Sequence, residues 1–222
     1  MGETVELTAN DGHTLSAYVA GNADATSSVV IIQEIFGVNS HIRSVVDMYA
    51  DLGYYAIAPA MFDRAERSVD LDYTEEGMAA GFAVRENIDW LLTPLDVGAA
   101  VEYVRRDRPV AVIGFCWGGG ASWLAASELN IDAAVSYYGG QIKMFLDRAP
   151  QCPVMLHFGE TDHSIPPEDI REIHDAYPET PLFVYEDAGH GFNCDIRASY
   201  NAQASAQALV RTKAFLSEHL KW

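Results

Sequence analysis

Short, continuously apolar runs alternate along the chain with longer segments in which apolar residues recur every three or four positions. Such runs are typical of strands that are covered on both faces of a sheet. The predicted strands are 29–32, 54–58, 109–113, 133–138, 154–159 and 182–185. Since the segments between them predict helices, the sequence indicates an α/β protein whose sheet is mainly parallel and has helices on both faces.

The helical segments carry recognisable start and stop signals. Ser40 can cap a helix whose apolar stripe runs to Leu52 and which Gly53 ends. Pro94 lies at the first position of another helix, with Asp96 in the same turn. Further helices are expected after residue 119, around 168–177 and over 199–220.

Two segments depart from the alternation. The turn signal Asn10-Asp11-Gly12 separates 4–8 from 14–20, which predicts an antiparallel pair at the sheet edge and about seven to eight strands in all. Residues 60–93 are charged and irregular, and we expect an excursion with one or two short helices that caps an active site. No internal repeat interrupts the pattern, so residues 1–222 are expected to form a single domain.

Composition narrows the class of protein. The 222-residue chain is 49% hydrophobic, enough for one ordinary core, and has no apolar stretch long enough to cross a bilayer. Its net charge of −18 would repel nucleic acid and anionic membranes, so we expect neither as a partner. The acidic N-terminus has no signal pattern and the three cysteines are widely spaced, which favours a cytoplasmic protein.

The chain is organised around the hexapeptide Gly114-Phe115-Cys116-Trp117-Gly118-Gly119, between a predicted strand and a predicted helix. A nucleophile at the apex of so sharp a turn needs small residues two positions before and after it, because the two backbones nearly touch there. Two other interpretations stay open at this point. Cys116 could be a buried structural cysteine, or the turn could cradle a phosphate, although the glycine spacing of a dinucleotide site is absent.

Glu34, Asp162 and His190 each come shortly after a predicted strand. The carboxyl ends of parallel strands meet at one edge of a sheet, where the chemistry of such folds collects. The order Cys116, Asp162, His190 along the chain is that of the α/β-hydrolase arrangement, in which the histidine moves the proton and the carboxylate orients it. Each residue alone could be an ordinary loop residue, but the joint pattern favours a hydrolase.

Four motifs together resemble the dienelactone hydrolase (carboxymethylenebutenolidase) family, a branch of the α/β-hydrolases, over nearly the whole chain. The motifs are Gln33-Glu34-Ile35-Phe36-Gly37, the hexapeptide at 114–119, Gly159-Glu160-Thr161-Asp162 and Ala188-Gly189-His190-Gly191-Phe192. The first motif combined with a cysteine at the elbow is the specific part, since most α/β-hydrolases have serine there.

The resemblance implies a Cys116–His190–Asp162 triad that acts on an enol-lactone or a similar activated ester. It also implies that Glu34 hydrogen-bonds the resting thiol and helps to generate the thiolate when substrate enters, which would protect the thiol from stray oxidation. The implied oxyanion hole consists of the backbone N–H groups of Ile35 and Trp117.

The family binds its substrate carboxylate with arginines, and Arg64 matches one of them. A second family arginine corresponds here to Cys194, and Arg197, three residues further on, is the candidate replacement. Tyr138 matches a pocket tyrosine of the family. The ordinary alternatives are a surface arginine for Arg64 and aromatic core packing for Tyr138.

We therefore expect a monomeric or small homo-oligomeric hydrolase of lactones or esters. The missing arginine favours, as an alternative, an esterase or thioesterase that uses the same residues on a different acyl group. A non-catalytic binding protein on the same fold is the other alternative. No metal-ligand spacing is evident among Cys152, Cys194 and the histidines, so no metal and no organic cofactor is expected.

Overall fold

The computed structural model describes residues 2–221, which contain one eight-stranded sheet in the order β1-β2-β4-β3-β5-β6-β7-β8. Strand β2 is antiparallel to both of its neighbours, whereas the pairs from β4 to β8 are parallel. The strands are β1 (Glu3–Thr8), β2 (Thr14–Ala20), β3 (Ser28–Ile32), β4 (Tyr55–Pro59), β5 (Val110–Phe115), β6 (Ala133–Tyr137), β7 (Val154–Gly159) and β8 (Leu182–Tyr185). The predicted α/β class, mainly parallel sheet and edge hairpin are confirmed.

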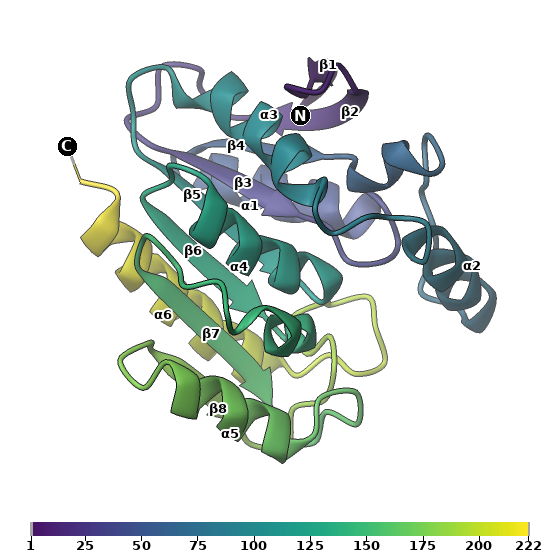
Figure 1. Ribbon diagram of the computed structural model, residues 1–222, viewed down its shortest axis with the longest axis vertical. Coiled ribbons are helices and arrows are strands. Elements are labelled where there is room, and N and C mark those ends of the chain that lie inside the picture. Colours follow the sequence, from purple (N-terminus) through teal and green to yellow (C-terminus); the bar gives the residue numbers. More distant parts are fainter. Residues whose placement is uncertain (1, 222) are drawn as a thin grey trace.

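Helices cover both faces of this sheet (Figure 1). In the view of Figure 1, helices α3 (Thr93–Arg105), α4 (Trp117–Glu128) and α5 (Pro167–Ala176) lie in front of the sheet, and α1 (Ser40–Asp51) and α6 (Ala202–His219) lie behind it. Helix α2 (Glu75–Arg85) projects at the periphery. Two 3₁₀ helices, η1 (Met61–Arg64) and η2 (Gly140–Phe145), complete the described elements.

The centre of the sheet is buried on both faces. Every residue of β3, β4, β5, β6 and β7 is buried, whereas the edge strand β8 is partly exposed. Ile31, Ile113 and Val135 are in register across three neighbouring strands, and each is completely buried. This double burial explains why these strands show continuous apolar runs in place of alternation. Among residues 2–221, no helix combines the length and apolar content needed to span a membrane.

Local details differ from the sequence-based expectations at helix ends. Asn39, not Ser40, caps α1: its side chain accepts a hydrogen bond from the Ile42 N–H, and Ser40 is already helical. The apolar stripe of α1 stops at Tyr49, because Leu52 lies past the helix end and is 39% exposed. The helix η2 was not predicted from the sequence, since a six-residue 3₁₀ helix leaves little periodic signal.

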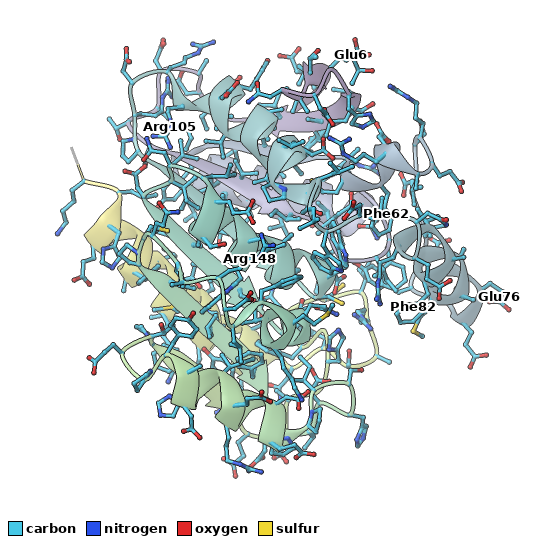
Figure 2. The ribbon with its side chains drawn as sticks, viewed as in Figure 1. Glu6, Phe62, Glu76, Phe82, Arg105 and Arg148 are labelled. Atoms are coloured by element: carbon cyan, nitrogen blue, oxygen red, sulfur yellow. The ribbon has the colours of Figure 1, made fainter. Side chains whose placement is uncertain are left out.

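The irregular segment 60–93 does contain two short helices, η1 and α2, as expected. Side chains of this segment lie against the glycine-rich turn: the Phe62 ring meets the Trp117 ring edge-on at 5.4 Å, and Trp90 stacks on Trp117 at 5.0 Å. Phe82, which is labelled with Phe62 in Figure 2, lies on α2 and is 44% exposed. The segment thus contacts the turn through its two ends.

Candidate active site

Cys116 lies at the apex of a strained turn between β5 and α4. Its backbone has φ 55° and ψ −116°, a conformation that non-glycine residues rarely adopt. The flanking glycines permit the turn, since a Cβ atom on Gly114 would collide with the carbonyl oxygen of Gly118. A Cβ atom on Gly118 would in turn meet the carbonyl oxygens of Ile32 and Gln33. The turn has the form of a nucleophile elbow.

The elbow packing leads to a stability prediction for Gly114→Ala. Because the added methyl group would clash with rigid backbone, we expect the free energy of unfolding to fall by about 3 kcal/mol in urea titrations. Gly98→Ala is the matched control: its new methyl group would lie 3.6 Å from Leu129 Cδ2, an ordinary contact, within helix α3. The control should be neutral or more stable by about 0.5–1 kcal/mol. Equal effects of the two changes would contradict this account of the elbow.

The thiol, an imidazole and a carboxylate form a continuous chain of contacts. The Sγ atom of Cys116 lies 3.1 Å from Nε2 of His190, and Nδ1 of His190 lies 2.8 Å from Oδ2 of Asp162. The other carboxylate oxygen of Asp162 accepts a hydrogen bond from the Ser164 N–H at 2.8 Å. The Asp162 side chain is fully buried, and that of His190 is 21% exposed. The structure thus brings together three residues that the sequence placed after β5, β7 and β8.

The charges around Cys116, His190 and Asp162 favour a positively charged imidazole. Burial alone lowers the pKa of His190, but the neighbouring Cys116 charge and the hydrogen bond with Asp162 outweigh it and raise this pKa to about 10. An imidazolium that faces the sulfur stabilises a thiolate, which is the nucleophilic form of cysteine. The arrangement therefore places a positively charged imidazole beside the sulfur, as thiol nucleophiles require.

Glu34 has different partners from those implied by the resemblance. Its carboxylate accepts hydrogen bonds from Arg197 Nη1 at 3.1 Å and from the Tyr73 hydroxyl at 2.6 Å, and its side chain is fully buried. The thiol of Cys116 meanwhile faces His190. In this geometry Glu34 therefore does not contact the thiol, since a buried carboxylate is stabilised by a cation and a hydroxyl donor, and its expected role toward the resting thiol stays a prediction.

Arg197 reaches the buried carboxylate from the loop before α6. Its guanidinium carbon lies 5.8 Å from the Phe36 ring centre and 5.4 Å from the Tyr73 ring centre. The side chain also packs so closely over Gly191, which has φ 76°, that a Cβ atom there would strike the guanidinium. Tyr73 was missed by the sequence analysis, because nothing in the irregular segment 60–93 distinguishes it from other aromatic residues.

Arg64 lies in an internal ion-pair network. It makes two hydrogen bonds with the buried Asp96 carboxylate, at 2.7 and 2.8 Å, and one with Asp11 at 2.9 Å. Its donors are thus shared between two carboxylates, and its side chain is 11% exposed. This geometry does not support the expected role in binding a substrate carboxylate, because an anion would have to displace an existing bidentate ion pair.

Tyr138 packs beside the imidazole. Its ring centre lies 5.2 Å from that of His190, and its φ is 41°. The hydroxyl group is buried and makes no hydrogen bond with any residue in 2–221. Burial and the nearby Glu34 carboxylate raise the pKa of Tyr138 well above its usual value, so the hydroxyl keeps its proton. The site therefore contains a buried, unused donor next to the triad.

The two expected oxyanion-hole donors are free of internal partners. Within residues 2–221 neither the Ile35 N–H nor the Trp117 N–H makes a hydrogen bond. Trp117 begins α4, whose N-terminus adds a positive partial charge. Ile35 is held by α2, where Gly81 packs against the Ile35 carbonyl so closely that a side chain would not fit. Both donors thus belong to segments that meet at the elbow.

An eight-stranded, mostly parallel sheet with a nucleophile elbow defines an α/β-hydrolase. Residues 15–220 match the model of the dienelactone hydrolase family. The chain belongs to the dienelactone hydrolase family and is a hydrolase of the ester or lactone type.

Named relatives support the same assignment. The chain is 36% identical to a putative carboxymethylenebutenolidase of Synechocystis, over 87% of this chain and 86% of that protein. It is 32% identical to the carboxymethylenebutenolidase of Pseudomonas putida, over 97% and 96% of the two chains. Among solved structures, a putative dienelactone hydrolase of Klebsiella pneumoniae superposes with a TM-score of 0.83 at 28% identity, over 98% of this chain and 99% of that one.

Proposed function

We propose that the protein hydrolyses an enol-lactone or a similarly activated carboxylic ester through a Cys116–His190–Asp162 triad. The observation that carries the proposal is the unbroken chain of contacts, 3.1 and 2.8 Å long, that ends on a thiol at a strained elbow. The raised pKa of His190 supports an ion pair with the thiolate before substrate binds. Activation of the thiol is therefore assigned to His190, within hydrogen-bond distance of it.

The proposed reaction has two steps. The thiolate of Cys116 attacks the carbonyl carbon, and the N–H groups of Ile35 and Trp117 stabilise the negative oxygen. The bond to the enolate oxygen then breaks, and the leaving group takes a proton from His190. In the second step His190 removes a proton from water, the resulting hydroxide attacks the thioester, and the carbon–sulfur bond breaks to release the acid and regenerate the thiolate beside protonated His190. Asp162 keeps the imidazole in the required tautomer throughout.

We assign recognition of a substrate carboxylate to Arg197. Its guanidinium donates a hydrogen bond to Glu34, and Arg197 follows His190 in the same loop, whereas Arg64 is engaged by Asp96 and Asp11. Glu34 acts through Arg197 in this proposal, because its carboxylate positions the guanidinium and neutralises it until an anion arrives. Tyr138 would supply a further donor to the bound substrate through its unpaired hydroxyl.

The first test is the loss of dienelactone absorbance on mixing with the purified protein. Turnover would support the proposal. A neutral aryl ester or thioester turned over in place of the dienelactone would instead support the alternative esterase or thioesterase function, which is favoured by the engagement of Arg64 in an internal ion pair. Absence of turnover with every substrate would leave the non-catalytic binding protein. The three free thiols in the structure fit a reducing, cytoplasmic environment for such an enzyme.

Arg197→Met tests the recognition step. Loss of a charge-assisted contact should lower kcat/KM for a carboxylate-bearing ester by roughly 10- to 100-fold, mainly through KM, and should change kcat/KM for its neutral analogue much less. Arg211→Met is the control, since Arg211 lies over the rings of Phe183 and Tyr185 at the β8 edge. Equal losses for both esters would show that Arg197 supports the site only structurally.

A further inference from the structure

The loop that carries His190 brings two further chemically active side chains beside helix α1. A ring nitrogen of His41, the Sγ atom of Cys194 and a carboxylate oxygen of Asp195 all lie within 4.8 Å of one another. The Nδ1 atom of His41 lies 3.3 Å from Oδ1 of Asp195. None of these three residues takes part in the proposed reaction, and their donor atoms are of the kinds that hold transition metals.

His41 is left without the hydrogen bonds that a buried imidazole normally has. It is 5% exposed, and within residues 2–221 neither of its ring nitrogens makes a hydrogen bond. Buried polar groups in native proteins are nearly always paired, and the 3.3 Å contact of Nδ1 with Asp195 is the one polar contact found for this ring within residues 2–221, so the imidazole is suited to a further partner that is not a protein group. The Tyr73 ring centre lies 6.2 Å from that of His41, with the two ring planes nearly perpendicular, so this ring does not replace a hydrogen bond.

Cys194 is a buried donor and Asp195 is a solvent-exposed one. Cys194 is completely buried, so its sulfur is shielded from bulk solvent. The Asp195 side chain is 65% exposed, and together with His41 it lines a cavity of about 260 Å³ that can admit a hydrated ion. The net charge of −18 attracts cations to the protein.

We propose that His41, Cys194 and Asp195 form a three-ligand site for a divalent cation of the zinc class, with water as the fourth ligand. A tetrahedral ion at ordinary zinc–ligand distances separates its donor atoms by about 3.3–3.7 Å, which matches the His41–Asp195 distance. Thiolate and imidazole ligands favour zinc, cobalt or copper over magnesium or calcium. On binding, the Cys194 S–H bond breaks, its proton leaves to solvent and the sulfur–metal bond forms.

Cobalt(II) titration of the metal-free protein tests this site. Cobalt adopts the same tetrahedral geometry, and its bond to a thiolate gives a charge-transfer band in the near ultraviolet. One equivalent should produce this band in the wild type, and added zinc should abolish it. The three cysteines allow matched variants: Cys194→Ser should lose the band, whereas Cys152→Ser and Cys116→Ser should keep it. Circular dichroism of each metal-free variant establishes that it is folded.

Asp195→Asn keeps the test decisive if a buried substitution disturbs folding, because this side chain is largely exposed. It should weaken cobalt affinity at least tenfold without altering the metal-free circular dichroism spectrum. The proposal is overturned if the wild type shows no thiolate band with a stoichiometric amount of cobalt. It is also overturned if the band disappears in Cys116→Ser and persists in Cys194→Ser, since the catalytic thiol would then be the ligand. Neither outcome depends on whether the protein turns over a dienelactone.

Discussion

Cys116→Ala should lower kcat/KM for the preferred ester by roughly 10⁵-fold or more, because no other group in the site can form the covalent intermediate. The thiol is the only side chain at the elbow apex, and it lies within 3.1 Å of the histidine that would accept its proton. Hydrolysis of the ester, followed by absorbance, gives the rate. An acyl adduct on the Cys116 peptide, found by mass spectrometry with a slow substrate, would identify the same atom independently.

Cys152→Ala is the matched control for this change. Burial raises the pKa of the Cys152 thiol to about 12, so it stays protonated and unreactive. The Cys152→Ala substitution should leave kcat/KM within about twofold of the wild type, since substitutions away from the active site usually have small effects. Substantial activity in folded Cys116→Ala protein would instead rule out the proposed nucleophile.

Asp162→Asn should lower kcat by about 10⁴-fold while substrate binding persists. The buried carboxylate fixes the proton on Nδ1 of His190 through a 2.8 Å contact and stabilises the positive imidazolium. An amide of the same shape favours the wrong tautomer and carries no charge. Since the Asp162 hydrogen bond helps to raise the pKa of His190 to about 10, this pKa should fall in the variant.

The histidine titration separates a catalytic role of Asp162 from a purely structural one. A folded-state pKa above the usual value of about 6.5 means that the imidazolium pair stabilises the protein fully below pH 6.5 and loses this effect as pH rises through about 10. Nuclear magnetic resonance of labelled histidine should show the midpoint near pH 10 in the wild type. Glu160→Gln, in the same loop, should leave midpoint and kcat unchanged. An unshifted midpoint in Asp162→Asn would refute the assigned role.

The environment of Glu34 has consequences for substrate choice. The carboxylate is fully buried, and Arg197 and Tyr73 are its hydrogen-bond donors. A substrate anion that binds Arg197 must compete with this internal ion pair, so the gain in affinity is a difference between two similar contacts. Because Arg64 is paired with Asp96 and Asp11, it is not available as a second cation for a substrate anion. Under the proposed assignment of Arg197, discrimination between carboxylate-bearing and neutral esters would therefore rest on this one arginine.

The sequence by itself determined the features that depend on local pattern. Continuous apolar runs predicted the buried strands, because parallel strands bury both faces. Small residues at fixed spacing around Cys116 predicted the elbow, since that turn has a steric requirement that only glycine meets. The positions of Cys116, Asp162 and His190, each after a different predicted parallel strand, predicted that the three would meet, because parallel strands end at one edge of the sheet.

Only the tertiary structure decided which charges pair. The sequence favoured Arg64 as the anion binder and offered Arg197 only as a replacement for a missing family arginine, but in the fold Arg64 pairs with Asp96 and Arg197 reaches Glu34. The proximity of His41 to Cys194 was likewise invisible, because these residues lie far apart in the chain. Long side chains find partners through packing of distant loops, and no spacing rule encodes that geometry. Steric requirements of a turn depend on residues that are adjacent in the sequence, whereas the pairing of charges depends on how distant segments pack in the fold.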